Sequence, residues 1–394
     1  MSNQKRVIII GNGPNGIAIA HALVNEGGVD PSDILIVDNK GPMEQFGHHV
    51  ANIGMTNMRS PWDVSVVRSR ESLERFSEAL DSPSRGDGWR PSWETFKHHA
   101  VSVLSALQLP TLHDRVTHAT PTARNTWEIK TGEGATLLTD NLIVATGLAP
   151  HRVQPFEHAT ALPEQPLLPK GGRIAIVGGG MTATNAAITL LSREDQANGT
   201  EVTLFSPHGM EHEEGLGPWL SGALRDDACN SAGAEEARES FLKLDIEDRL
   251  SFLMGHRIDG TINIGHLSEL SDDSMRGRFF VEEVRVTKIL ARRYGRFMVI
   301  TRKNTYPNFD AVYDARGYHP NLDNLRSITG LVEAVGDRRY EQYPLIDDTT
   351  GATLPGLYFA GALSALSFGP AASTVAGGTM LGHVIARDLL RNRN

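Results

Sequence analysis

The sequence predicts an α/β fold with two parallel sheets, and three observations carry that prediction. An apolar, β-branched run at Val7–Ile10 leads directly into a glycine-rich turn and a helix of small residues. The same order of elements recurs from Arg173 onward. The distance from the first glycine to the end of the next apolar run is 27 positions in one unit (Gly11 to Asp38) and 28 in the other (Gly178 to Ser206). Two units with matching spacing are far more specific than one glycine motif.

The first unit has the order strand, turn, helix, strand. Residues 7–10 are short and apolar throughout, as in a parallel strand buried on both faces. Residues 17–24 are small and apolar, which suits a helix packed tightly on a sheet. A turn near 27–32 then precedes a second strand at 34–37. This order is typical of a dinucleotide-binding unit.

The glycine turn of this unit is expected to bind a pyrophosphate. Gly11 permits the tight turn, Gly13 leaves room for the phosphates, and Gly16 permits close contact between helix and strand. The start of the helix adds unpaired N–H donors and a favourable dipole. Asp38 ends the next strand, where a carboxylate accepts hydrogen bonds from ribose hydroxyls. The candidate residues of the turn are Gly11, Asn12, Gly13, Pro14, Asn15 and Gly16.

The second unit places a strand at 173–177, a helix at 184–191 and a strand at 202–205. Its candidate nucleotide residues in the turn are Gly178, Gly180, Met181, Thr182 and Ala183, with the alanine in place of the third glycine.

The strand at 202–205 is followed by Ser206 and His208 and by no carboxylate. Because a carboxylate there would repel a 2′-phosphate, its absence favours NADPH over NADH. NADH stays open, as does the alternative that Ser206 and His208 are ordinary loop residues.

Other segments complete the predicted sheets. A buried strand at 142–147 ends in Ala145, Thr146 and Gly147, and the segment 311–317 looks like a second version of it. A last strand at 356–361 is followed by a helical stretch at 371–390. Residues 239–250 form an amphipathic pattern, and a strand at 297–300 follows a turn at Tyr294–Gly295.

Composition narrows the class of protein. A length of 394 residues predicts two or three domains. A net charge of −9 argues against a broad nucleic-acid surface, and no apolar run approaches the length of a membrane span. Cys229 is the only cysteine, which excludes an intrachain disulfide, a redox cysteine pair and a cysteine-rich zinc site. We therefore expect a cytoplasmic protein.

The order of the segments resembles the two-dinucleotide-binding flavoprotein superfamily. The resemblance implies two Rossmann-like dinucleotide-binding domains, with FAD in the first and a nicotinamide nucleotide in the second. It also implies that the C-terminal segment completes the first domain. The expected limits are 1–160 with 312–394 for a discontinuous FAD domain, and 165–311 for the inserted NAD(P)H domain.

Within the superfamily, the sequence looks like the class B flavin-dependent monooxygenases, including those that hydroxylate amines. The segments 54–62, 367–370 and 375–377 carry this resemblance. The lone cysteine excludes a thioredoxin-reductase-like enzyme. Gly361–Ala362 stands where many reductases have Gly-Asp, and the signature Phe-x-Gly-x-x-x-His is missing, since no glycine separates Phe156 from His158. The reaction subclass therefore stays open.

The resemblance also implies residues near the flavin and the nicotinamide. Arg59 is the candidate catalytic residue, because a charged group beside the reacting oxygen and the nicotinamide would help; the alternative is a surface or structural arginine. For Gly369–Pro370 the alternative is a plain turn that starts a helix. The further cofactor-binding candidates are Met55, Thr146, Gly147, Gly361, Phe368, Gly369 and Pro370.

The expected function is an FAD-containing, NADPH-dependent monooxygenase that N-hydroxylates an amine. One alternative is an NAD(P)H-dependent reductase that passes electrons to a protein or quinone, and another is a flavin-binding redox sensor without steady turnover. The expected partners are a small-molecule substrate and oxygen, with no nucleic acid, no membrane and no metal. Neighbouring histidines such as His48 and His49 do not face one point. A homodimer is expected on base rates.

Overall fold

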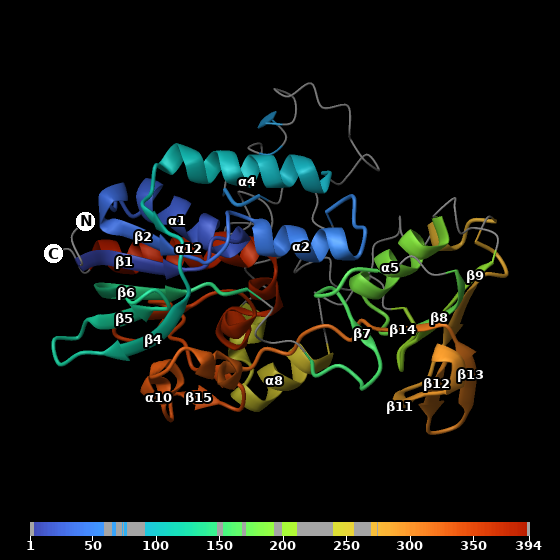
Figure 1. Ribbon diagram of the computed structural model, residues 1–394. Helices are drawn as coiled ribbons and strands as arrows, with labels where there is room; N and C mark the ends of the chain where they lie inside the picture. The colour runs from blue at the N-terminus through green and yellow to red at the C-terminus, as the bar shows by residue number, and fades with distance from the viewer. Residues whose placement is uncertain are drawn as a thin grey trace.

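The described residues fold around two large sheets, with a three-stranded sheet and a two-stranded ribbon beside them (Figure 1). Among the described residues, no helix is long and apolar enough to cross a bilayer. The computed structural model describes residues 4–58, 65–67, 73, 75–76, 91–147, 153–167, 171–192, 199–210, 239–255, 269–273 and 275–391.

The first sheet is built on four parallel strands in the order β18, β6, β1, β2. These strands are β1 (Gln4–Ile10), β2 (Ile34–Val37), β6 (Thr136–Val144) and β18 (Leu357–Phe359). The apolar ends of all four are buried, as expected for parallel strands covered on both faces. The sheet continues through β3 (Thr111–Leu112), β4 (Val116–Pro121), β5 (Trp127–Thr131) and β17 (Ala352–Leu354).

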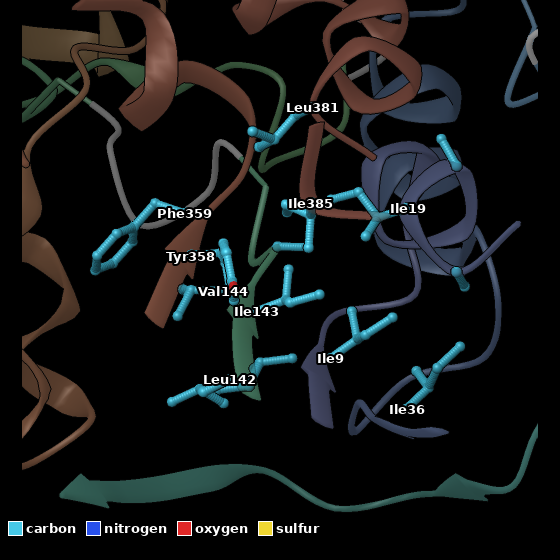
Figure 2. Close-up of a cluster of buried hydrophobic side chains, with 14 of the residues drawn as sticks. Ile9, Ile19, Ile36, Leu142, Ile143, Val144, Tyr358, Phe359, Leu381 and Ile385 are labelled. Carbon is cyan, nitrogen blue, oxygen red and sulfur yellow. The ribbon is translucent and has the colours of Figure 1, made fainter. Parts of the chain in front are cut away.

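Two helices from opposite ends of the chain pack side by side on this sheet. They are α1 (Pro14–Asn25) and α12 (Val375–Arg391) (Figure 1). Cβ atoms added at Gly378 and Gly382 would press against Ala18 and Ala22, so small residues let the two helices approach closely. Figure 2 shows Ile19 of α1 and Leu381 and Ile385 of α12 in one cluster with the strand side chains.

The second sheet has five parallel strands in the order β10, β9, β8, β14, β7. Side chains alternate between its faces: Ile174 and Ile176 pack with α5 (Met181–Ser192), whereas Ala175 and Val177 face a three-stranded antiparallel sheet. The five strands are β7 (Thr160–Ala161), β8 (Gly172–Val177), β9 (Thr200–Phe205), β10 (Phe279–Glu282) and β14 (Ala311–Asp314). The three antiparallel strands are β11 (Val286–Ala291), β12 (Phe297–Thr301) and β13 (Thr305–Phe309).

Most of the expected elements are present, and two differ. The helix expected at 239–250 is interrupted at Leu244–Asp245, and α8 (Ile246–Gly255) begins after the break. There the Asp245 carboxylate accepts the backbone N–H of Asp248, which competes with a continuous helix. The helix expected at 371–390 begins only at Val375, because Pro370–Ser373 forms a 3₁₀ turn and Thr374 is extended.

Further elements connect the two sheets and cover the first. The helices are α2 (Glu44–Asn52), α4 (Trp93–Leu107), α10 (Leu331–Val335) and α11 (Ala365–Phe368), with a two-stranded ribbon of β15 (Arg339–Tyr340) and β16 (Tyr343–Pro344). The 3₁₀ turns are η1 (Pro31–Asp33), η5 (Arg293–Gly295), η6 (Leu322–Ser327), η7 (Gly361–Ser364) and η8 (Pro370–Ser373).

Candidate functional site: two glycine turns at the carboxyl edges of the sheets

The carboxyl ends of the parallel strands of the first sheet lie at one level. Ile10 pairs with both Val37 and Val144, and Val144 pairs with Phe359. The residues that follow these strands are Gly11, Asp38, Ala145 and Ala360. The sheet register therefore gathers most of the first group of candidates at a single edge. In open α/β sheets, this is the edge at which ligands bind.

Backbone crowding explains two of the glycines in the first turn. Gly11 has φ +109°, and a Cβ there would overlap the carbonyl oxygen of Ala145. A Cβ on Gly16 would overlap the carbonyl oxygen of Gly11. Gly13 differs, since a Cβ there would meet no protein atom within 4 Å. No protein atom of the described residues therefore fills the space beside Gly13.

Asp38 is tied to the turn by backbone donors. Its Oδ2 accepts the N–H of Asn12 at 2.9 Å, and its Oδ1 accepts the N–H of Lys40 at 3.0 Å. Asn12 is buried, and its side-chain amide donates to the Lys40 carbonyl at 3.0 Å. These bonds hold the carboxylate beside the glycine turn. Sequence reasoning placed Asp38 at this edge but did not foresee its bond to Asn12.

Asn15 links the turn to the C-terminal segment. It lies against Gly361 and Gly378, where added Cβ atoms would come within 2.9 Å of its Nδ2 and 2.6 Å of its Oδ1. The Oδ1 atom is buried and has no hydrogen-bond partner. Since buried polar atoms are normally satisfied, this acceptor marks a place for a donor from outside the chain.

The other first-unit candidates occupy different surroundings. Thr146 and Gly147 follow β6 directly, and Gly147 is exposed with φ +72°. Phe368 is fully buried in the first hydrophobic core, and Gly369 (φ +84°) and Pro370 form the turn that precedes α12.

The segment proposed to approach the flavin from residue 54 onward is described only in part. Met55 packs against both the first and the second hydrophobic cluster, so it lies where the two units meet. Arg59, the candidate catalytic residue, lies outside the described residues.

The second glycine turn repeats the crowding of the first. Gly178 has φ +139°, and a Cβ there would overlap the carbonyl oxygen of Ala315, as Gly11 would meet Ala145. A Cβ on Gly179 would overlap the Gly209 carbonyl oxygen. Gly180 leads into α5, where Met181 and Ala183 are buried and Thr182 is half-buried.

The loop after β9 differs from its counterpart in the first unit. Ser206 is buried, and its Oγ would lie 2.5 Å from a Cβ on Gly179 and accepts the His208 N–H at 3.4 Å. The His208 side chain is exposed. A Glu283 carboxylate oxygen lies near Gly209, 3.1 Å from the position of a Cβ. The Ser206 hydroxyl, which stands where the first unit has a carboxylate, thus faces the glycine turn. The His208 side chain, in the same loop, is exposed to solvent.

Where the chain passes between the sheets, an ion pair that sequence reasoning missed joins two segments. Asp314, at the end of β14, accepts the Arg316 Nη2–H at 2.7 Å and the Phe156 N–H at 2.9 Å. The Arg316 guanidinium lies 3.9 Å from the centre of the Phe156 ring. An acid and a base two positions apart after a strand were visible in the sequence, but the contact with Phe156 was not.

A second set of contacts lies beside α2. The Tyr318 hydroxyl donates to Glu164 Oε1 at 2.8 Å, and the His49 ring stacks on the Tyr318 ring at 6.3 Å. Burial lowers the pKa of His49, and the nearby Glu164 carboxylate partly opposes that shift. Asn52 donates to the Pro163 carbonyl at 2.8 Å. These contacts fix α2 against the chain that enters the second sheet.

Both turns fit the pyrophosphate of a dinucleotide. At α1, the first helical hydrogen bond runs from the Ile17 N–H to the Gly13 carbonyl, so the amides of Asn15 and Gly16 precede it. These donors and the open space above Gly13 suit a phosphate-bearing ligand. The α5 turn has the same backbone approach at Gly178.

Comparisons with known proteins agree with this geometry. The ornithine N-hydroxylase of Kutzneria sp. 744, in a structure with reduced FAD, NADP⁺ and L-ornithine, is 17% identical with a TM-score of 0.77; the match covers 99% of this chain and 100% of that chain. The cadaverine monooxygenase of Erwinia amylovora, bound to FAD, is 15% identical with a TM-score of 0.75, covering 97% and 94%. The bacillithiol disulfide reductase of Staphylococcus aureus is 17% identical with a TM-score of 0.62, covering 99% and 99%.

No curated protein matches the sequence. The neighbours confirm the predicted α/β fold and its resemblance to the two-domain flavoproteins. Residues 5–227, more than half of the chain, match the family model described as pyridine nucleotide-disulphide oxidoreductase. The chain therefore belongs to the pyridine nucleotide-disulphide oxidoreductase family.

Proposed function

We propose that this chain is an FAD-containing, NADPH-dependent monooxygenase that N-hydroxylates an amine of a small molecule. The observation that carries the proposal is the likeness, over nearly the whole chain, to amine hydroxylases. The ornithine and cadaverine enzymes match with TM-scores of 0.77 and 0.75, against 0.62 for the disulfide reductase. Cys229, as the only cysteine, supports the same choice, because an intrachain dithiol cannot form.

The first glycine turn would hold FAD. The backbone of Gly13 and the start of α1 would receive the pyrophosphate, and Asp38 would accept the ribose hydroxyls. Asn15 would satisfy its buried Oδ1 by accepting a hydrogen bond from the cofactor or a water that it orders. Thr146, Gly147 and the segment from Gly361 to Pro370 would line the flavin side of the same edge.

The second glycine turn would hold NADPH. The backbone from Gly178 to Gly180 and the start of α5 would receive its pyrophosphate. Ser206 leaves the ribose position without a carboxylate, and the exposed His208 is placed to meet a 2′-phosphate. NADH would bind by the same contacts without that last one.

When bound, the two cofactors supply hydride transfer and the activation of oxygen. The residues of the chain would bind the two cofactors, orient them and shield them from water. The turns fix both nucleotides at the carboxyl edges of their sheets, and Met55 packs at the meeting of the two cores. Arg59 stays the proposed catalytic residue, placing a positive charge near the reacting oxygen.

Several further assignments belong to this proposal. Oxygen is the second substrate, the location is the cytoplasm, and the enzyme is a homodimer. The division into 1–160 with 312–394 and 165–311 is kept as the domain assignment.

A reductase without oxygen transfer is the second candidate. The family description and the likeness to the bacillithiol disulfide reductase favour it. With a single cysteine, such an enzyme would need an acceptor outside the chain, for example a quinone or another protein. A redox sensor without steady turnover would instead show slow NADPH consumption under every condition.

One experiment separates these candidates. The purified yellow protein is reduced with NADPH in the absence of oxygen, mixed with oxygen and an amine such as ornithine, lysine or cadaverine, and its products are analysed by mass spectrometry. An amine that gains one oxygen atom, labelled when ¹⁸O₂ is used, supports N-hydroxylation. Rapid reduction of a quinone with no oxygenated amine in a broader screen would replace the proposal with the reductase.

A further inference from the structure

Two segments of the chain cross between the sheets. One follows β6 of the first sheet and enters β7 of the second, and it includes residues 153–159. The other leaves β14 and reaches Leu322, which is buried in the first core. Figure 1 shows both segments between the two sheets, the first in green and the second in orange. They touch directly, since the Val153 N–H donates to the Gly317 carbonyl at 3.2 Å.

A single side chain joins these two crossings. Arg316 donates through Nε and Nη2 to both oxygens of Asp314, at 2.9 and 2.7 Å, and through Nη2 to the Gln154 carbonyl at 2.7 Å. Its guanidinium also covers the Phe156 ring. The first crossing is therefore held by a bond to its backbone and by contact with one of its rings.

Asp314 holds the same crossing from the other side. Its carboxylate accepts the Phe156 N–H, and its carbonyl accepts, at 2.9 Å, the N–H of Leu162, the residue directly after β7. The side chain is only 5% exposed, so its charge depends on the arginine for compensation. The planar guanidinium satisfies both oxygens at once, which a lysine ammonium does not reproduce. Asp314, Arg316 and Phe156 are called the crossing clamp below.

We propose that Arg316 is a positioning residue for hydride transfer, acting through the crossing clamp to fix the nicotinamide unit relative to the flavin unit. This inference rests on the proposed function. In the step concerned, a hydride leaves C4 of NADPH and joins N5 of FAD, so that the C–H bond breaks, an N–H bond forms, NADPH becomes NADP⁺ and FAD becomes FADH⁻. Because both crossings pass through the clamp, loosening it changes how the two units are held relative to each other. Arg316 follows Ala315, whose carbonyl approaches Gly178, and Arg316→Lys alters only the side chain and not this backbone.

The expected effect is on rate and not on affinity. Reaction between two bound groups requires close, aligned contact, and a misplacement of about 1 Å costs about 100-fold in rate. Arg316→Lys changes no backbone atom, so we expect the approach of the Ala315 carbonyl to Gly178 to remain, and the Kd of NADP⁺ checks this. A clamp that is merely structural would lower the stability of the protein and leave the rate of flavin reduction per folded, FAD-loaded molecule unchanged.

The test compares Arg316→Lys with Arg339→Lys in the full chain. Arg339 makes a similar two-pronged ion pair with Asp323, at 2.8 and 2.9 Å, but both residues belong to the part packed on the first sheet. Phe156→Leu is a second variant, which keeps an apolar side chain and removes the ring from under the guanidinium. Single-turnover flavin reduction by NADPH is followed without oxygen, together with the Kd of NADP⁺.

We expect Arg316→Lys to slow flavin reduction about 10- to 100-fold with the Kd of NADP⁺ changed by less than about threefold, and Phe156→Leu to slow it less. Arg339→Lys should stay within about twofold of the wild type. Reduction at the wild-type rate in Arg316→Lys, or an equal loss in the Arg339 control, would overturn the proposal.

A second measurement does not depend on turnover. Amide hydrogen exchange of the protein without nicotinamide should be faster at Val153, Phe156 and Leu162 in Arg316→Lys than in the wild type, and unchanged there in Arg339→Lys. Unchanged exchange at these amides would overturn the proposal that Arg316 holds the two crossings together. If the wild-type flavin is not reduced by NADPH or NADH, the proposed function fails instead, and exchange still decides whether Arg316 joins the crossings.

Discussion

The two glycine turns share the approach of their first glycine to a carbonyl oxygen and differ in the side chain that faces the turn from the end of the next strand. In both, the first glycine has a positive φ and approaches a carbonyl oxygen, that of Ala145 in one and Ala315 in the other. In the first turn, the carboxylate of Asp38 accepts the amide of Asn12, whereas in the second, Ser206 accepts the amide of His208. Close approach of the backbone to a carbonyl oxygen is therefore common to the two turns. The residue after the second strand of each unit, Asp38 or Ser206, is one position at which the two sites differ.

If both turns need a glycine that approaches a carbonyl oxygen, replacing either first glycine by alanine should lower the free energy of unfolding the most. Gly11→Ala and Gly178→Ala should each destabilise the protein by about 3 kcal/mol or more, because strain at positive φ adds to overlap with a carbonyl. Urea unfolding measures this. Gly134→Ala is the matched control, since Gly134 has φ +91° but open space around it. A cost at Gly178 no larger than at Gly134 would contradict the shared crowding.

The second prediction separates binding from folding at the first turn. Gly13→Val should abolish FAD binding by filling the approach of the phosphates, while the apoprotein keeps its stability within about 1 kcal/mol. Gly13 has φ −76° and ψ −172°, an extended conformation that valine adopts readily, and no protein atom opposes the new side chain. The ratio of flavin to protein absorbance measures occupancy. Normal occupancy would refute the assignment of this turn.

The third prediction makes the second turn resemble the first. Ser206→Asp should place a carboxylate beside Gly179 and weaken NADPH binding about 30-fold, or ~2 kcal/mol, relative to NADH. Ser206→Asn has the same shape without the charge and should change the two affinities alike. Titration of the protein with each nucleotide gives the comparison. Equal losses for both nucleotides in Ser206→Asp would remove the case for a 2′-phosphate at this position.

The smallest expected effect is a pH dependence that belongs to the first unit. Burial lowers the pKa of His99, in α4, to about 4, and its Nδ1 lies 3.2 Å from Ser65 Oγ. The unfolded state therefore binds more protons between pH 6.5 and 4, so stability rises with pH across that window. We expect a loss of about 1.5 kcal/mol from pH 6.5 to 5.

His99→Gln should flatten this dependence. Urea unfolding at several pH values compares the variant with the wild type, and the same slope in both would show that another group is responsible.

The sequence was sufficient where a feature depends on neighbours along the chain. The strand at 7–10, its glycine turn and the recurrence from Arg173 follow from local patterns, and the structure has them. The break at Asp245 was missed because a side chain that caps the next turn competes with an apolar pattern that continues across it. Phe156 was noted only as part of an incomplete signature. Its contact with Arg316 spans 160 positions and leaves no periodic signal.

The residues of the candidate site also fall into those that local sequence predicts and those that depend on distant contacts. The glycines and Asp38 were identified because each performs a local backbone task. The direction of the Ser206 side chain was not predictable, since it depends on how Gly209 folds back over Gly179. The ion pair between Asp314 and Arg316 had a local signal, but its purpose appears only when the two crossing segments are seen together.

The pairing of Phe359 with Val144 has a consequence for folding during synthesis on the ribosome. On the ribosome, the whole second sheet emerges before β18 and α12 do. During that interval β6 is open along Leu142–Val144 on the side away from β1, and the face of α1 that will receive Gly378 and Gly382 is uncovered. Unpaired edges and uncovered apolar faces are the surfaces that aggregate or recruit chaperones. The strands of the second sheet therefore all precede the strand and helix that complete the first, β18 and α12.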